Sequence, residues 1–153
     1  IYFLILMFIG GCAGSTTCGI KIFRVQILFQ FISNQLKKII YPRGIFNIKY
    51  ENNNVNEKFM ASIISFIFLY ILIFFIITAL LTIDGLNFTT AISAAATSIS
   101  NVGPGLGDII GPNGNFSQLS DFSKWILSTG MILGRLELFA ILVLFIPSFW
   151  RKY

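Results

Sequence analysis

The sequence has 153 residues, of which 56% are hydrophobic and 11% are charged, and its formal net charge is +5. Soluble domains carry about 25% charged residues, so this composition indicates a membrane protein. The basic residues lie mainly between apolar segments, as the positive-inside rule requires, and we expect no nucleic-acid partner. The sequence contains no histidine, which removes most general acid–base, haem and zinc chemistry. We therefore predict neither an enzyme nor a bound cofactor.

The first forty residues combine a short apolar run with a glycine-rich break. Ile1–Ile9 is too short to span a bilayer, which needs about 20 residues. It lacks a charged leading region and a cleavage pattern, so we expect a fragment of a longer protein rather than a signal peptide. Four glycines lie between Gly10 and Gly19, and a helix is expected from about Ile20 to about Ile40.

The stretch from Ser33 to Lys58 is the one clearly aqueous part of the chain. It holds five of the eleven basic residues, so we expect it to face the cytoplasm. Ile45–Tyr50, followed by Asn52–Asn54, predicts a short hairpin. Residues 41–58 are interpreted as a cytoplasmic linker between two membrane units.

Three apolar segments follow the linker. Phe59–Ile83 has 25 residues and no charge, which predicts a transmembrane helix. Thr89–Ser100 has only 12 residues and cannot cross, so it is interpreted as a re-entrant half-helix. Trp125–Trp150 has 26 residues and predicts a second span, with Arg151 and Lys152 at its cytoplasmic end.

This order fixes an expected topology. The linker and the C-terminus share the cytoplasm only if the half-helix and the glycines after it enter and leave by the outer face. The resulting unit is outer helix, half-helix, glycine loop and inner helix, in residues 59–153. Residues 1–40 fit the last three parts of the same unit, which predicts a weak internal repeat.

Asn101–Gly107 contains three glycines and a proline, so its backbone is extended or looped. Irregular backbone at membrane depth is tolerated where it is buried in protein or lines a water-filled cavity. A half-helix that points its C-terminus inward favours a cation, and carbonyl oxygens can replace the water around the ion. Without a carboxylate, such a site suits a monovalent cation. Taken alone, the loop fits a filter and a tight extracellular turn equally well.

Arg135 and Glu137 lie in the middle of the last predicted span, where an ionisable side chain should face a cavity or a partner. Gly130 and Gly134 permit close helix contact there. Residues two apart on a helix do not face each other, so an Arg135–Glu137 pair is a poor explanation. Arg135 is interpreted as an electrostatic barrier or gate, or as a tether for the glycine-broken helix of the other repeat.

Several motifs, taken together, resemble the TrkH/KtrB potassium uptake family over essentially the whole chain. The segment resembling the third pore loop begins at Met7, and the segments resembling the fourth pore loop and inner helix begin at Asn101. The motifs are Met7–Thr16 with Gly19-Ile-Lys21, Tyr41-Pro-Arg-Gly44, Asn101–Gly107, Leu119–Trp125, Gly130–Phe139 and Pro147–Arg151.

The resemblance implies an all-α integral membrane protein of the potassium-channel type, with four pore repeats around one ion path. It places the third and fourth repeats in this chain, as a C-terminal half. The filter residues it implies for potassium, with sodium as a second candidate, are Cys12, Ala13, Gly14 and Ser15, and Asn101, Val102, Gly103 and Pro104. The gate residues it implies are Gly19, Lys21 and Arg135.

The resemblance also implies a multi-pass protein of the inner or plasma membrane that forms a homodimer. Its expected partners are the lipid bilayer and a cytoplasmic nucleotide-binding regulatory subunit. Thr17-Cys18 departs from the usual glycine-rich pattern. Two alternatives stay open: a secondary transporter that holds a small solute at its glycine-broken helices, and a non-transporting scaffold or truncated relic.

Overall fold

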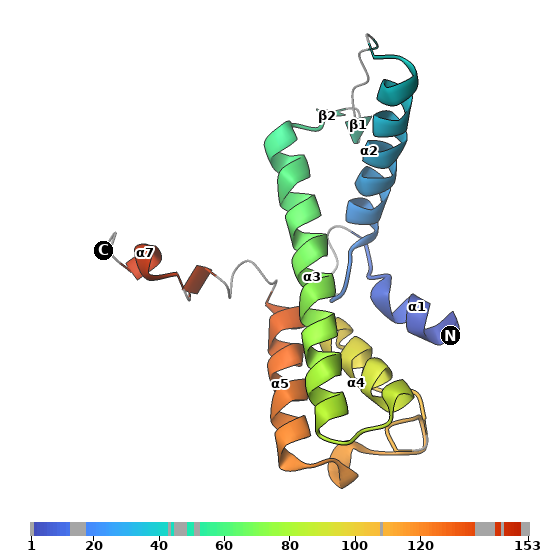
Figure 1. The fold of residues 1–153 in the computed structure, drawn as a ribbon, viewed down its shortest axis with the longest axis vertical. Coiled ribbons are helices and arrows are strands. Elements are labelled where there is room, and N and C mark those ends of the chain that lie inside the picture. The colour runs from blue at the N-terminus through green and yellow to red at the C-terminus, as the bar shows by residue number, and fades with distance from the viewer. Residues whose placement is uncertain are drawn as a thin grey trace.

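The computed structural model describes residues 2–12, 18–42, 44, 49–50, 53–107, 109–136, 143–144 and 146–150. These residues form helices and one two-stranded hairpin (Figure 1). The elements are α1 (Tyr2–Phe8), α2 (Ile22–Ile40), β1 (Lys49–Tyr50), β2 (Asn53–Asn54), α3 (Glu57–Ile83), α4 (Phe88–Ser100), the 3₁₀ turn η1 (Phe116–Gln118), α5 (Asp121–Arg135) and α7 (Pro147–Trp150).

Helix α3 is the longest element and the scaffold for the others. Its 27 residues include the predicted span Phe59–Ile83, which is confirmed as helix and begins two residues earlier than expected. Among the described residues, Lys58–Ile83 is the one helical segment long and apolar enough to cross a membrane. Large apolar side chains such as Phe68 and Phe75 are exposed on its surface. Such a surface is suited to lipid or to further helices.

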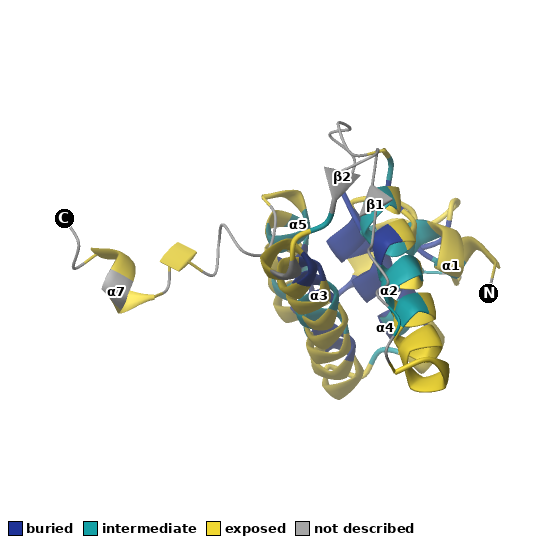
Figure 2. Ribbon diagram, turned by 90° about the horizontal axis from the view of Figure 1, so that it is seen from above, coloured by how far each residue is buried: buried dark blue, intermediate teal, exposed yellow. Residues whose placement is uncertain are grey.

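Helix α4 packs against α3, α5 and α1, and in the view from above it lies between them (Figure 2). Ten of its 13 residues are buried, and nearly all of these are alanine, serine or threonine. Small side chains let the two neighbouring helices approach the backbone of α4 closely. The core around it contains Ala91, Ala94, Ala95, Ile99, Leu81 and Leu127.

Helix α5 differs from the uninterrupted span predicted over Trp125–Trp150. It begins at Asp121, where the Ser120 hydroxyl accepts the hydrogen bond of the Ser123 backbone N–H, and it ends at Arg135. A new short helix begins at Pro147, after the non-helical Ile146. Proline lacks a backbone donor and is favoured at the first position of a helix, which explains why one continuous helix through residue 147 was the wrong prediction.

Helix α2 and the hairpin lie beside the N-terminal half of α3 (Figure 1). Ile27 of α2 packs with Met60 and Ile63 of α3 in a second small core. The predicted hairpin is present as two antiparallel pairs, Lys49 with Asn54 and Tyr50 with Asn53. The preceding residues 45–48 lie outside the described part of the chain.

Candidate functional site

The second glycine-rich segment, Asn101–Gly107, begins where α4 ends. Asn101 caps the helix in the left-handed conformation, with φ 53° and ψ 41°. Gly103 and Gly107 also have positive φ, at +108° and +106°. A side chain disfavours this conformation, so glycine is needed at both positions. The helix therefore ends at Ser100, and the backbone after it takes an irregular course.

The segment then runs back along the helix that leads into it. The backbone N–H of Gly103 donates to Thr97 Oγ1 at 2.9 Å, and that of Val102 donates to the Thr97 carbonyl oxygen at 3.1 Å. Further along, Ser93 Oγ donates to the Leu106 carbonyl oxygen at 3.0 Å. Later residues of the segment thus contact earlier residues of α4. The half-helix and its loop enter and leave at the same end, as the sequence predicted.

Helix α5 supports the turn from the other side. The Asn101 side-chain amide donates to the Met131 carbonyl oxygen at 3.0 Å, and Ser98 Oγ donates to that of Leu127 at 2.7 Å. A Cβ atom on Gly134 would overlap the backbone carbonyl oxygen of Ile99, and one on Gly130 would overlap Ser98 Oγ. The close helix contact predicted from the two glycines is confirmed, and its partner is the last turn of α4.

This arrangement leaves exposed, irregular backbone at the end of a buried half-helix. Residues 101–104 are exposed, and residues 102–105 belong to neither a helix nor a strand. Their backbone is therefore not part of helix or strand pairing. No side chain in residues 101–104 is charged, so a cation here would be coordinated by neutral oxygen atoms.

The first glycine-rich segment is described only at its two ends, which pair with each other. Ile9 and Ile20 form a parallel bridge, in which the Ile20 N–H donates to the Phe8 carbonyl oxygen at 3.1 Å and the Gly10 N–H donates to that of Ile20 at 2.9 Å. The chain that leaves this segment therefore runs in the same direction as the chain that enters it. The returning strand expected here falls on residues 13–17, which lie outside the described part of the chain, so the second copy of the unit stays a prediction.

The filter residues expected in the first segment are only partly visible. Cys12 is described and exposed, whereas Ala13, Gly14 and Ser15 lie outside the described residues. Their role stays a prediction.

One of the expected gate residues, Arg135, contacts the residue next to another, Gly19. Arg135 Nη1 lies 3.7 Å from Cys18 Sγ, although the two residues are 117 positions apart. Gly19 is buried next to Cys18 and has φ +91°. Lys21 is half-buried and precedes the first turn of α2. The end of α5 thus contacts Cys18, at the far end of the first glycine-rich segment, which is the position expected of a tether.

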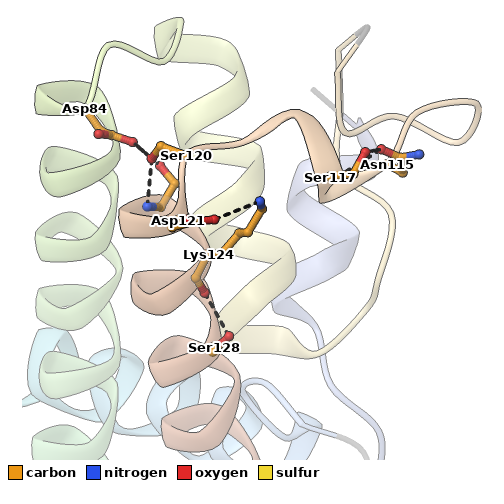
Figure 3. Close-up of polar contacts among 8 residues, drawn as sticks. Asp84, Asn115, Ser117, Ser120, Asp121, Lys124 and Ser128 are labelled. Carbon is orange, nitrogen blue, oxygen red and sulfur yellow. Dashed lines mark hydrogen bonds and ion pairs between the residues drawn. The ribbon is translucent and has the colours of Figure 1, made fainter.

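A polar cluster at the opposite end of α5 was not predicted. Asp84, at the end of α3, accepts hydrogen bonds from the hydroxyls of Ser120 and Ser123, the latter at 2.6 Å (Figure 3). These hydroxyl donors lower the pKa of the Asp84 carboxyl below its ordinary value. The cluster fixes the start of α5 against the end of α3. Two features of the sequence indicate this cluster: an acidic residue directly after a long apolar helix, and a Ser-x-x-Ser pattern typical of a helix N-cap.

Comparison with known proteins identifies the family to which this geometry belongs. The family described as "TrkH: Cation transport protein" matches residues 1–152. The chain belongs to the TrkH family. This membership makes it a membrane protein of helical fold and accounts for its exposed apolar side chains.

Individual relatives agree with the family assignment. The TrkH-family chain is 45% identical over 150 residues to the Trk system potassium uptake protein TrkI of Halomonas elongata, covering 98% of this chain and 30% of that protein. It is 37% identical over 145 residues to the Trk system potassium uptake protein TrkH of Escherichia coli K12, covering 95% of this chain and 29% of that one.

A solved structure shares the fold. The potassium transporter TrkH from Vibrio parahaemolyticus superposes with a TM-score of 0.86 at 34% sequence identity, over 97% of this chain and 31% of that one. The chain therefore spans about 30% of the length of the relatives it matches.

Proposed function

We propose that this chain forms part of the ion path of a potassium-translocating membrane protein. The observation that carries the proposal is the course of residues 101–107, which return along α4 and leave residues 101–104 exposed beside its C-terminal end. The helix dipole places partial negative charge at that end, which favours a cation. The printed names of the relatives, potassium uptake protein and potassium transporter, give the ion.

The two glycine-rich segments have separate roles in this proposal. Asn101, Val102, Gly103 and Pro104 contribute one strand of the selectivity filter. The contact of Arg135 with Cys18 supports a gate role for the residues that follow, Gly19 and Lys21, with Arg135 holding the gate. A positive charge near the path also opposes cation passage.

The wider setting is part of the same proposal. The protein crosses the inner or plasma membrane several times, with residues 41–58 and the C-terminus in the cytoplasm. It forms a homodimer, and a cytoplasmic nucleotide-binding subunit regulates it. The ion is the transported substrate, and neither a cofactor nor a nucleic acid takes part.

Growth on limiting potassium tests the function. The natural full-length protein should restore growth to cells that lack potassium uptake, and Gly103→Ser should reduce the preference for potassium over sodium. The φ of +108° disfavours any side chain at Gly103, although there is open space around it. An unchanged preference in the variant would refute the filter assignment. Uptake of an organic solute without cation flux would support a secondary transporter instead.

The gate assignment has its own test. Arg135→Ala removes the contact with Cys18 and the positive charge, so cation flux should rise while ion preference stays the same. Arg135→Lys, which keeps the charge, should raise flux less. Unchanged flux in an Arg135→Ala protein present at normal amounts would contradict the barrier role.

A further inference from the structure

A buried tyrosine hydroxyl in α3 contacts the residue that precedes the proposed filter strand. Tyr70 lies in the middle of α3 and is only 1% exposed. Its hydroxyl oxygen is 2.8 Å from Ser100 Oγ, and Ser100 is the last residue of α4, directly before Asn101. Burying a hydroxyl without a hydrogen bond is costly, so this contact selects one position of α4 relative to α3.

The ring of Tyr70 is held from two directions, which fixes where its hydroxyl points. Phe66 stacks on it with ring centroids 6.2 Å apart, and Phe8 of α1 meets it edge-on at 6.1 Å. The ring centroid of Phe66 in turn lies 4.0 Å from the guanidinium carbon of Arg24 in α2. The tyrosine is thus held by aromatic and cation–π contacts that join three helices.

Tyr70 holds the start of the filter strand on a side that its other contacts do not reach. Thr97 fixes the strand to its own half-helix, and Asn101 fixes it to α5. The Tyr70–Ser100 contact joins the end of the half-helix to α3, on another side. Together these contacts hold the carbonyl groups that follow Ser100 in a defined position.

We propose that Tyr70 is a positioning residue for ion selection, acting through Ser100 on the strand that begins at Asn101. This proposal rests on the proposed ion path. A filter discriminates between potassium and sodium by the number and placement of its oxygen atoms. Freeing one end of the strand should therefore lower the ratio of potassium to sodium uptake, whereas the amount of protein in the membrane should change little.

The test compares Tyr70→Phe, Ser100→Ala and the double variant in the natural full-length protein. Each removes the hydroxyl contact and keeps the surrounding packing. Thr78→Val is the matched control, because it removes another buried hydroxyl of α3, one that donates to the Phe74 carbonyl oxygen at 2.8 Å within the same helix. The ratio of potassium to sodium uptake is measured together with the amount of protein in the membrane.

We expect each single variant to lower the ratio about fivefold, which corresponds to about 1 kcal/mol at 25 °C. The double variant should lose no more than either single variant, because both remove the same contact. Thr78→Val should keep the wild-type ratio. Unchanged ratios in Tyr70→Phe and Ser100→Ala, additive losses, or an equal loss in Thr78→Val would overturn the role of Tyr70. A wild-type protein that takes up no potassium would instead refute the proposed function.

Discussion

Residues 101–107 are held along the helix that leads into them, whereas the described ends of the first glycine-rich segment, residues 9–12 and 18–20, are held by pairing with each other. Both segments are rich in glycine and follow a short helix. The described contacts differ because the short helices differ in composition. Helix α4 has the hydroxyls of Ser93 and Thr97 on one face, and these bind the returning strand. Helix α1 contains only apolar residues and Tyr2, and the backbone groups of the residues after it bond to Ile20.

Glycine therefore shows where the backbone becomes irregular, and in residues 101–107 the neighbouring polar side chains hold its course. If the proposed filter and gate are correct, substitutions around residues 101–107 change which ion passes. Substitutions around residues 9–22 change how fast ions pass. The following experiments examine the two regions separately.

The largest effect is expected from Gly134→Ala. The added methyl group would overlap the carbonyl oxygen of Ile99, and because both groups belong to rigid helices, α5 must move away from α4. We expect a loss of stability of about 3 kcal/mol and loss of most potassium uptake. Thermal unfolding in detergent measures the first and uptake assays the second. Ser128→Ala, on the exposed face of the same helix, should change little, and a stable, active Gly134→Ala protein would contradict the support by α5.

A smaller effect is expected from Thr97→Val, which keeps the shape of a fully buried side chain and removes the acceptor for the Gly103 N–H. An unpaired polar group costs about 1–3 kcal/mol, and the strand is expected to shift to avoid it. The potassium-to-sodium uptake ratio should fall, whereas Thr97→Ser, which keeps the hydroxyl, should stay near wild type. Equal ratios in the valine and serine variants would show that the hydroxyl does not hold the strand.

The first segment is tested by Gly10→Ala. Its new Cβ would lie 2.8 Å from the Cys18 carbonyl oxygen and 3.2 Å from that of Ile20. The pairing between the two ends of the segment should open and disturb the contact of Cys18 with Arg135. The rate of uptake should then rise about fivefold, which corresponds to an activation free energy lower by about 1 kcal/mol. Initial rates of uptake measure this effect. Wild-type rates in the variant would show that the first segment takes no part in gating.

The smallest effect concerns Asp84, which lies outside both segments. Its carboxyl pKa is lowered in the folded protein, so its stabilising effect is complete above the unfolded carboxyl pKa of about 4 and is lost as the pH falls through the lowered value. Asp84→Asn should lower the thermal midpoint slightly at pH 7, and the difference from wild type should vanish in acid. Asp121→Asn, an exposed carboxylate paired with Lys124, is the control, and a difference independent of pH would contradict the assignment.

The sequence predicted the parts of this fold that depend on length and local pattern. The span from Phe59 to Ile83 follows from its uninterrupted apolar run, and the half-helix from the small residues before Asn101. The contact made by Gly134 follows from its spacing to Gly130. The pairing of Ile9 with Ile20 did not follow, because the hydrogen bonds that join Phe8 and Gly10 to Ile20 link the two sides of the glycine-rich segment and leave no local pattern.

Two further features depend on distant partners. The end of α5 at Arg135 does not follow from composition, because most residues from Trp125 to Trp150 are apolar. The anchor at Tyr70 was hidden in an apolar helix, because one tyrosine in a span carries no sign of the serine it contacts 30 residues later.

A paired measurement on Gly103→Ser and Gly10→Ala tests the central claim most directly. Rates of potassium and sodium uptake are determined for both variants in the same cells, normalised to the amount of protein in the membrane. We predict that Gly103→Ser lowers the ratio of potassium to sodium uptake, while Gly10→Ala changes both rates by the same factor and keeps the ratio. A change in the ratio for Gly10→Ala, or an unchanged ratio for Gly103→Ser, would contradict the division of roles between the two segments.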